Sequence, residues 1–120
     1  MAVRSYEELE VWQKAMDLVM VIYNRTATFP REEIYGLTSQ MRRAAVSVPS
    51  NIAEGQGRRT TGEFLNQVSM ARGSLMELQT QVEIARRLTY LTPEAAQELK
   101  ELLTSVAMML NALIRSLRNK

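Results

Sequence analysis

Length, composition and charge already exclude several classes of protein. The chain has 120 residues, 46% of them hydrophobic and 23% charged, so we expect one globular domain covering residues 1–120. It contains no Cys and no His, which excludes disulfides, thiol nucleophiles, imidazole bases and metal sites built from thiolates or imidazoles. We therefore predict a protein that is not an enzyme, with no catalytic residues, no metal and no cofactor. The net charge of +2 permits a polyanionic partner without arguing strongly for one.

The apolar segments predict neither a membrane span nor a secretion signal. The longest apolar runs, residues 18–23 and 106–110, fall far short of the roughly 20 residues that cross a bilayer. Residues 1–10 carry acidic side chains where a signal peptide needs apolar ones. The expectation is a cytoplasmic protein without a membrane partner.

Four segments carry apolar residues at spacings of three and four, which predicts four α-helices. The first helix is expected to run from Ser5, which forms a capping-box pattern with Glu8, to the Phe29-Pro30 pair. Its expected core stripe is Leu9, Trp12, Met16, Val19 and Tyr23. The second helix is expected to run from just after Pro30 to about Gly55. Its expected core stripe is Ile34, Leu37, Met41, Ala44 and Val48.

Pro49 lies inside the expected second helix. Proline has no backbone N–H and crowds the carbonyl four residues earlier, so we predict a kink or a local break near residues 47–50. Three neighbouring polar side chains are expected to bond the backbone groups that Pro49 leaves unpaired, namely Ser47, Ser50 and Asn51.

Glycines and capping patterns delimit the other two helices. The connection after the second helix is expected among Gly55, Gly57 and Gly62. Thr60 and Glu63 form a capping box for the third helix, which is expected to end near Thr89. Its stripe is Phe64, Val68, Ala71, Leu75, Leu78, Val82 and Ala85. Thr92-Pro93 predicts the start of the fourth, whose stripe is Leu99, Leu102, Val106, Met109 and Leu113.

The predicted fold follows from these four elements. Helices of similar length joined by short connections must lie antiparallel to their neighbours. The sequence therefore predicts an all-α protein, an antiparallel up-down-up-down four-helix bundle whose second helix is kinked at Pro49.

The first and fourth helices carry more apolar residues than one core stripe needs. The additional residues are Val11, Ala15, Leu18 and Ile22 in the first helix and Leu103, Ala107, Leu110 and Ile114 in the fourth. They either form a subunit interface, since large exposed apolar patches are uncommon on monomers, or broaden the contact with the core. Most methionines, including Met16, Met41, Met76 and Met109, are expected to fill the core.

Two groups of basic residues are candidates for phosphate binding. Arg42 and Arg43 are expected to face solvent on the second helix. With Arg58 and Arg59 in the following loop, they are predicted to form a patch that contacts phosphate oxygens. The second group, at the carboxyl end, is Arg115, Arg118 and Lys120. The alternatives are local: Glu54 stands four residues before Arg58, and cations at the end of a helix also favour its dipole.

Other polar and aromatic residues carry weaker signals. Glu83 stands three and four residues before two arginines, which predicts surface ion pairs. Glu63 and Glu77 lie outside the core stripes and are expected to be solvated. Aromatic residues make up 6% of the chain, and Trp12 and Tyr23 fall on a core stripe, so any nucleic acid is expected to be contacted mainly through its backbone.

Several segments resemble a known protein family, and the match covers nearly the whole chain. The segments are Val11-Trp12-Gln13-Lys14-Ala15, Phe29-Pro30, Glu33-Ile34-Tyr35-Gly36-Leu37, residues 42–55 and Gly73-Ser74-Leu75. They look like the four-helix bundle proteins encoded in intervening sequences of bacterial 23S ribosomal RNA genes. The resemblance implies a left-handed antiparallel bundle, a homopentameric ring and no catalytic residues. It also implies distant kinship with the accessory proteins of diversity-generating retroelement reverse transcriptases, which are similar pentamers that bind nucleic acid.

Two functional hypotheses follow. The first is a non-enzymatic homo-oligomer that binds structured RNA, ribosomal or other, or a ribonucleoprotein through contacts between arginines and phosphates. The second is a protein-interaction scaffold, or an accessory subunit of an element-encoded enzyme such as a reverse transcriptase, without direct RNA binding. The salt dependence of RNA binding separates them, because binding through phosphates weakens as salt rises.

Overall fold

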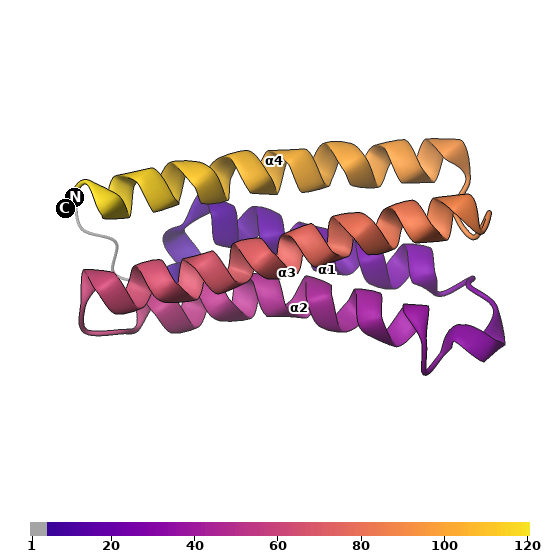
Figure 1. Ribbon diagram of the computed structural model, residues 1–120, viewed down its shortest axis with the longest axis horizontal. Helices are drawn as coiled ribbons and strands as arrows, with labels where there is room; N and C mark the ends of the chain where they lie inside the picture. Colours follow the sequence, from indigo (N-terminus) through magenta and orange to yellow (C-terminus); the bar gives the residue numbers. More distant parts are fainter. Residues whose placement is uncertain (1–4) are drawn as a thin grey trace.

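The computed structural model describes residues 5–120 and confirms the all-α fold class. The elements of this range are four α-helices and two short 3-10 helices, with no strand (Figure 1). The α-helices are α1 (Glu10–Thr26), α2 (Leu37–Gln56), α3 (Thr61–Arg87) and α4 (Pro93–Arg118). The 3-10 helices are η1 (Tyr6–Glu8) and η2 (Arg31–Glu33).

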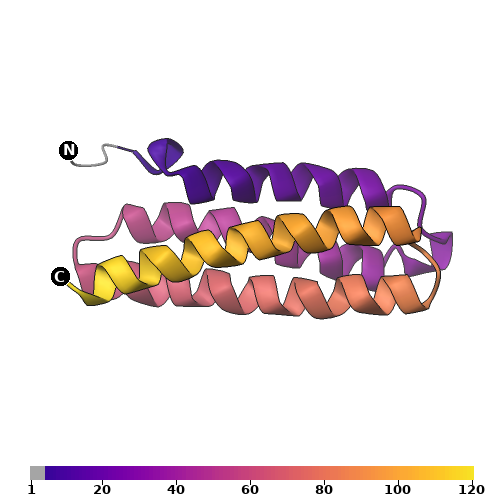
Figure 2. The ribbon, with the colours of Figure 1, turned by 90° about the horizontal axis from the view of Figure 1, so that it is seen from above.

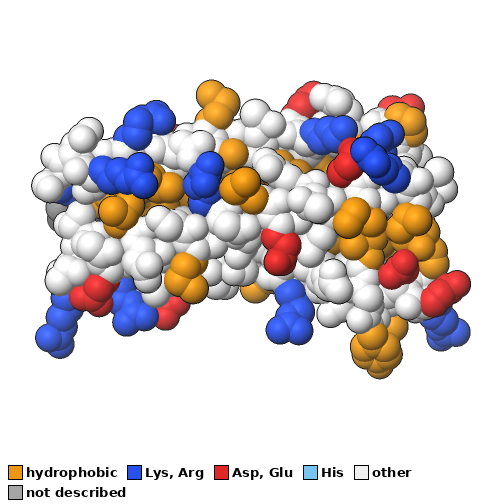
Figure 3. Space-filling model, in the orientation of Figure 1, with side chains coloured by type: hydrophobic (Ala, Val, Ile, Leu, Met, Phe, Trp, Pro, Cys, Tyr) orange, Lys and Arg blue, Asp and Glu red, His pale blue; other side chains and the backbone are white. Residues whose placement is uncertain are grey.

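The four α-helices lie along one long axis in a body of 45 × 24 × 19 Å (Figures 1 and 2). Each of them packs on two others, because α1 and α3 both contact α2 and α4. The sequence colours of successive helices run in opposite senses along this axis. One end of the bundle contains the connection 57–60, the start of α1 and the end of α4. We call it the α2–α3 end. The opposite end, with the connections 27–36 and 88–92, is the α3–α4 end. Charged side chains of both signs are spread along the face shown in Figure 3.

The first helix begins later than predicted. Ser5 caps η1 by accepting a hydrogen bond from the backbone N–H of Glu7 at 3.2 Å, and Leu9 then adopts an extended conformation with φ −77° and ψ 123°. The extended residue separates η1 from α1, which starts at Glu10. A capping pattern can therefore start a short 3-10 turn instead of the main helix.

The second helix also begins later than predicted, at Leu37 and not just after Pro30. The residues between Pro30 and Leu37 form η2 and a turn. The backbone N–H of Leu37 donates to Glu33 Oε1 at 3.1 Å. Ile34 thus lies before the helix, and its side chain is 55% exposed. Its predicted place in the core stripe is wrong because the helical period does not extend to it.

Helix α2 contains Pro49 without an interruption. The Asn51 side chain donates from Nδ2 to the Ser47 carbonyl at 2.9 Å, and the hydroxyls of Ser47 and Ser74 lie 2.8 Å apart, which joins α2 to α3. Ser50 is exposed and makes no hydrogen bond with the described residues through its side chain. The helix is therefore not broken, and the kink stays a prediction. Of the three expected polar neighbours only Asn51 bonds a backbone group, which is the Ser47 carbonyl and not the Ala45 carbonyl that Pro49 leaves unpaired.

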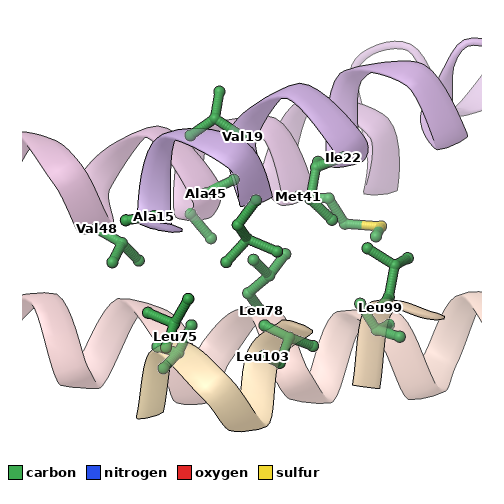
Figure 4. Packing of buried hydrophobic residues seen from close by; sticks show 14 of the residues in the cluster. Ala15, Val19, Ile22, Met41, Ala45, Val48, Leu75, Leu78, Leu99 and Leu103 are labelled. Atoms are coloured by element: carbon green, nitrogen blue, oxygen red, sulfur yellow. The ribbon is translucent and has the colours of Figure 1, made fainter. Parts of the chain in front are cut away.

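The buried face of α1 differs from the predicted stripe. Val11, Ala15, Leu18 and Ile22, which were expected beside the stripe, are buried in the core together with Val19. Figure 4 shows Ala15, Val19 and Ile22 among the core residues. Two stripe residues face outward instead: Met16 is 37% exposed and Tyr23 is 42% exposed. Both sets have helical spacing, so only the packing of α1 against α2 and α4 decides between them.

On α4, in contrast, the additional apolar residues broaden the core. Leu103, Leu110 and Ile114 are buried, and partly buried residues of the predicted stripe pack against the same core. The outward-facing large apolar side chain of this helix is Met108. The core interpretation is therefore correct for the additional residues of both helices, and the apolar side chains that α1 leaves outside the core include Met16 and Tyr23 of its predicted stripe.

The starts of α3 and α4 agree with the capping patterns. The Thr60 hydroxyl accepts from the backbone N–H of Glu63, and that of Thr92 accepts from Ala95, each at 3.1 Å. These side chains satisfy N–H groups that have no partner within the helix. Both predicted helix starts are confirmed.

Candidate nucleic-acid interface

Arg42 and Arg43 are adjacent in α2 but differ in their contacts. Arg42 donates from Nε to Thr26 Oγ1 at 2.9 Å and from Nη2 to the Tyr23 carbonyl at 3.3 Å, and its guanidinium lies 4.6 Å from the centre of the Tyr23 ring. These contacts hold the end of α1 against α2. Arg43 is exposed and its side chain has no hydrogen bond or ion pair with residues 5–120. Only Arg43 of this pair has an uncommitted guanidinium.

The predicted patch of four arginines is divided between two places. At a rise of about 1.5 Å per residue, residues 43 and 58 lie about 22 Å apart along the direction of α2. Arg58 pairs with Glu54 at 2.9 Å, as its sequence spacing predicted, whereas Arg59 is exposed without a partner in the part of the chain that the structure describes. Arg58 and Arg59 therefore lie too far from Arg42 and Arg43 to form one continuous patch with them.

The three cations at the carboxyl end of α4 lie at the same end of the bundle as Arg59. Figure 3 shows Lys and Arg side chains over the C-terminal half of α4. Four exposed cations at this end have no hydrogen bond or ion pair from their side chains to the described residues; we call them the terminal cation group, and they are Arg59, Arg115, Arg118 and Lys120. Two acids near Arg59 are engaged locally, since Glu54 pairs with Arg58 and Glu63 accepts from the Thr60 hydroxyl.

Most cations at the α3–α4 end are paired. Glu83 accepts from Arg86 at 2.7 Å and from Arg87 at 2.9 Å, which confirms the predicted ion pairs, and Lys100 approaches it at 3.5 Å. The hydrogen bonds from Arg86 and Arg87 hold the pKa of Glu83 well below its usual range. On the neighbouring helices Arg25 pairs with a carboxylate of α4 at 2.9 Å.

An apolar groove runs along α1 and α2. One part of it, of about 320 Å³, is lined by residues that include Trp12, Met16, Val46 and Pro49. A neighbouring hollow of about 530 Å³ includes Tyr23 and again Val46, but most of the residues that line it are polar and include Arg42 and Arg43. This α1–α2 groove is where the apolar face of α1 that stays outside the core meets solvent.

A second, more polar groove of about 690 Å³ lies between α2 and α3. Residues of this α2–α3 groove include Arg43, Glu77 and Tyr35, as well as Gln81. Gln81 is 6% exposed, and its Oε1 has no hydrogen-bond partner among the described residues. Sequence reasoning missed Gln81 and Tyr35, although Gln81 stands three residues after Leu78, at a core position where a polar side chain is unusual.

Two further properties concern metals and membranes. Within residues 5–120, no group of three or more acidic side chains is arranged to hold a metal ion. None of the described helices combines the length and apolar character that crossing a bilayer requires.

The fold and the length of the chain define a class of small helical bundle proteins, and the comparisons identify its family. The family model of the 23S rRNA-intervening sequence protein matches residues 7–112, so the chain belongs to this family. A crystal structure of a protein of unknown function from the S23 ribosomal protein family of Bacteroides thetaiotaomicron has a similar fold, with a TM-score of 0.81 and 21% identity. The match covers 88% of this chain and 95% of that one. Among curated proteins no match is found.

Proposed function

We propose that the protein is a non-enzymatic bundle that binds structured RNA, or RNA within a ribonucleoprotein, in the cytoplasm through contacts between cations and phosphates. The observation that supports this function best is the terminal cation group, whose four side chains have no partner among the described residues. A guanidinium without a partner can bind a phosphate without first giving up an ion pair. Arg43 and Arg58 are secondary contacts, and the contacts of Arg42 assign it a role within the fold.

Assembly would strengthen such binding. One chain carries a net charge of only +2, so its field is weak. In a homopentamer the net charge would be about +10, five times that of one chain, and the terminal cation group would be repeated around one ring. The α1–α2 groove offers an apolar surface for the contact between subunits. We therefore include self-association, as a pentamer, in the proposal.

The test compares two variants of equal charge. In the first, Arg59, Arg115, Arg118 and Lys120 are replaced by Gln. In the second, four paired cations are replaced in the same way, namely Arg25, Arg86, Arg87 and Lys100. RNA affinity is measured by fluorescence anisotropy from 50 to 200 mM salt.

The first variant should reduce the slope of log K against log salt by about 0.7 to 0.9 for each phosphate that is no longer bound, hence by about 3 in total. The control should change the slope by less than the value for one phosphate. Equal reductions in both variants would show that only net charge matters, and retained binding in the first would remove the terminal cation group from the proposal. Circular dichroism and light scattering verify helix content and oligomer mass.

A second candidate function is favoured by the apolar α1–α2 groove, which also suits a protein partner. The chain would then serve as a scaffold or as an accessory subunit of an enzyme such as a reverse transcriptase. Protein capture that does not depend on salt, without RNA binding, would favour this function. A stable mass near 13.7 kDa by light scattering at micromolar concentration would contradict self-association.

A further inference from the structure

We propose that the α2–α3 groove binds one unpaired guanine base of an RNA strand, an inference that rests on the proposed RNA-binding function and adds base selectivity to it. Backbone contacts by the terminal cation group carry no sequence information, because every nucleotide has the same phosphate. Selectivity needs groups that contact a base edge. The α2–α3 groove collects such groups outside that cation group.

Gln81 is the observation that first points to a ligand. Gln81 is only 6% exposed, and its Oε1 atom has no hydrogen-bond partner among the described residues. A buried acceptor without a donor carries a desolvation cost, so such groups are rare in folded proteins. Gln81 lines the α2–α3 groove, but its Oε1 atom is closed off from it, so a donor of a ligand there can satisfy this atom once the amide turns toward the groove.

Two oppositely charged side chains line the same groove without being paired to each other or to other described residues. Arg43, from α2, offers N–H donors, and Glu77, from α3, offers two carboxylate oxygens as acceptors. Elsewhere on α3, side chains of opposite charge satisfy each other, as Arg86 and Glu83 do at 2.7 Å. In the α2–α3 groove both signs stay available to a ligand that has donors and acceptors of its own.

Tyr35 gives the groove an aromatic face. Its side chain is 94% exposed, an unusual position for a large aromatic residue, and Ile84 adds an apolar side chain from α3. Exposed aromatic rings beside positive charge are a recurrent platform for unstacked bases. This combination favours a nucleobase over a peptide segment, whose backbone would not use the aromatic face.

Guanine is the base whose edge matches the available groups. Its N1–H and N2–H₂ donors lie side by side and match the two carboxylate oxygens of Glu77. Its O6 and N7 acceptors are the preferred partners of an arginine such as Arg43. Adenine and uracil each present a single donor group at the corresponding edge, so they leave one of the acceptors unpaired.

The experiment uses single-stranded RNA oligomers of equal length made of uridine, with one central guanosine, inosine, adenosine or uridine. Inosine has the N1–H of guanine but not its N2 amino group. Affinities are measured by anisotropy at low salt for the wild type, Glu77→Gln and Gln81→Met. The control is Glu94→Gln, which changes an exposed glutamate of α4 at the α3–α4 end.

The wild type should bind the guanosine strand about tenfold more tightly than the uridine strand, with inosine between them. Glu77→Gln should abolish this preference, whereas Glu94→Gln, which changes the net charge by the same amount, should keep it; both should raise the affinity for the uridine strand to a similar extent. Because Glu77 is exposed, this variant tests the proposal even if Gln81→Met does not fold. Binding of all strands with equal affinity, or of none of them while structured RNA still binds, would overturn the inference alone, whereas failure to bind either kind of RNA would overturn the proposed function as well. A change of oligomer mass in Glu77→Gln without a change of base preference would overturn the inference too and assign the groove to a contact between subunits.

Discussion

The two ends of the bundle use their charged residues in different ways. At the α3–α4 end, Glu83 takes up three cations, and Arg25 pairs with Glu98. Arg31 is an exception there, since it is exposed without a partner for its side chain among the described residues. At the α2–α3 end, the four side chains of the terminal cation group have no such partner, whereas Arg58 is ion-paired.

The difference follows from how each end is held together. At the α3–α4 end, Glu33 accepts from the backbone N–H of Leu37 and, at 2.9 Å, from the Tyr90 hydroxyl, whose ring lies 5.3 Å from that of Phe29. At the α2–α3 end, α2 packs closely on α3 at Gly55, and the connection between them is short. Where packing holds the chain, the charged side chains stay available to a partner.

The largest effect is expected from a substitution that disrupts the packing at the α2–α3 end. A Cβ on Gly55 would lie 2.8 Å from Gln67 Cβ and 2.9 Å from Phe64 Cδ1, so Gly55→Ala must push α2 and α3 apart. We expect a decrease of about 1 to 3 kcal/mol in the free energy of unfolding, measured by urea denaturation.

The matched control for this change is Gly73→Ala, also within a helix. A Cβ there meets no atom within 4 Å, and alanine is the better helix former, so this variant should gain about 0.5 to 1 kcal/mol. Equal effects of the two substitutions would mean that helix propensity, and not the contact at Gly55, decides the stability of this end.

A smaller effect is expected when the polar tie at the α3–α4 end is cut. Tyr90→Phe removes the hydrogen bond to Glu33 and should lower the free energy of unfolding by about 1 kcal/mol at pH 7. The control Tyr35→Phe changes an exposed hydroxyl and should stay within about 0.5 kcal/mol of the wild type.

The same hydrogen bond predicts a pH dependence. Donation to Glu33 raises the pKa of Tyr90 above its ordinary value of 10.0. The contribution of this hydrogen bond to the free energy of unfolding is therefore complete below pH 10 and disappears as the pH rises through the raised pKa of Tyr90. Urea midpoints of the wild type should fall more steeply above pH 10 than those of Tyr90→Phe. Parallel curves would show that Tyr90 contributes no titration-linked stability.

The smallest expected effect concerns the ion pairs of Glu83, which are exposed to solvent and screened. Arg86 and Arg87 lower the pKa of this carboxyl below its ordinary value of 4.5. The contribution of the ionised Glu83 to the free energy of unfolding is therefore present above about pH 5 and disappears as the pH falls. Glu83→Gln should therefore flatten the acid side of the stability curve, measured by urea denaturation between about pH 7 and pH 3. Glu94→Gln should follow the wild type, and a flattened curve in that control would assign the slope to general charge.

Local signals predicted more of the fold than of the candidate sites. The starts of α3 and α4 follow from Thr60 and Thr92, because a cap acts on backbone groups within one turn. The buried face of α1 could not be chosen from spacing alone, since two apolar sets share its helical period. For the same reason Met16, expected in the core, is exposed. Met76 of α3, also expected in the core, lies outside the stripe of that helix and is exposed as well.

The candidate sites depend on contacts between residues distant in sequence. The terminal cation group unites the connection after α2 with the end of α4, which only the topology brings to one end. Arg42 and Arg43 look equivalent in sequence, but Thr26 on α1 engages only the first. Gln81 could have been noticed from the sequence, because it is a polar residue on an apolar stripe. The groove that it lines could not, because the neighbouring helix forms its other side.

The hydrogen bond between Glu33 and Tyr90 also bears on how the chain folds. Its partners are 57 positions apart, with all of α2 and α3 between them. Closing so long a loop before those helices pair costs more chain entropy than forming the short connection 57–60 between them. We therefore expect the helix pairs joined by short connections, α2–α3 and α3–α4, to form before the Glu33–Tyr90 contact closes.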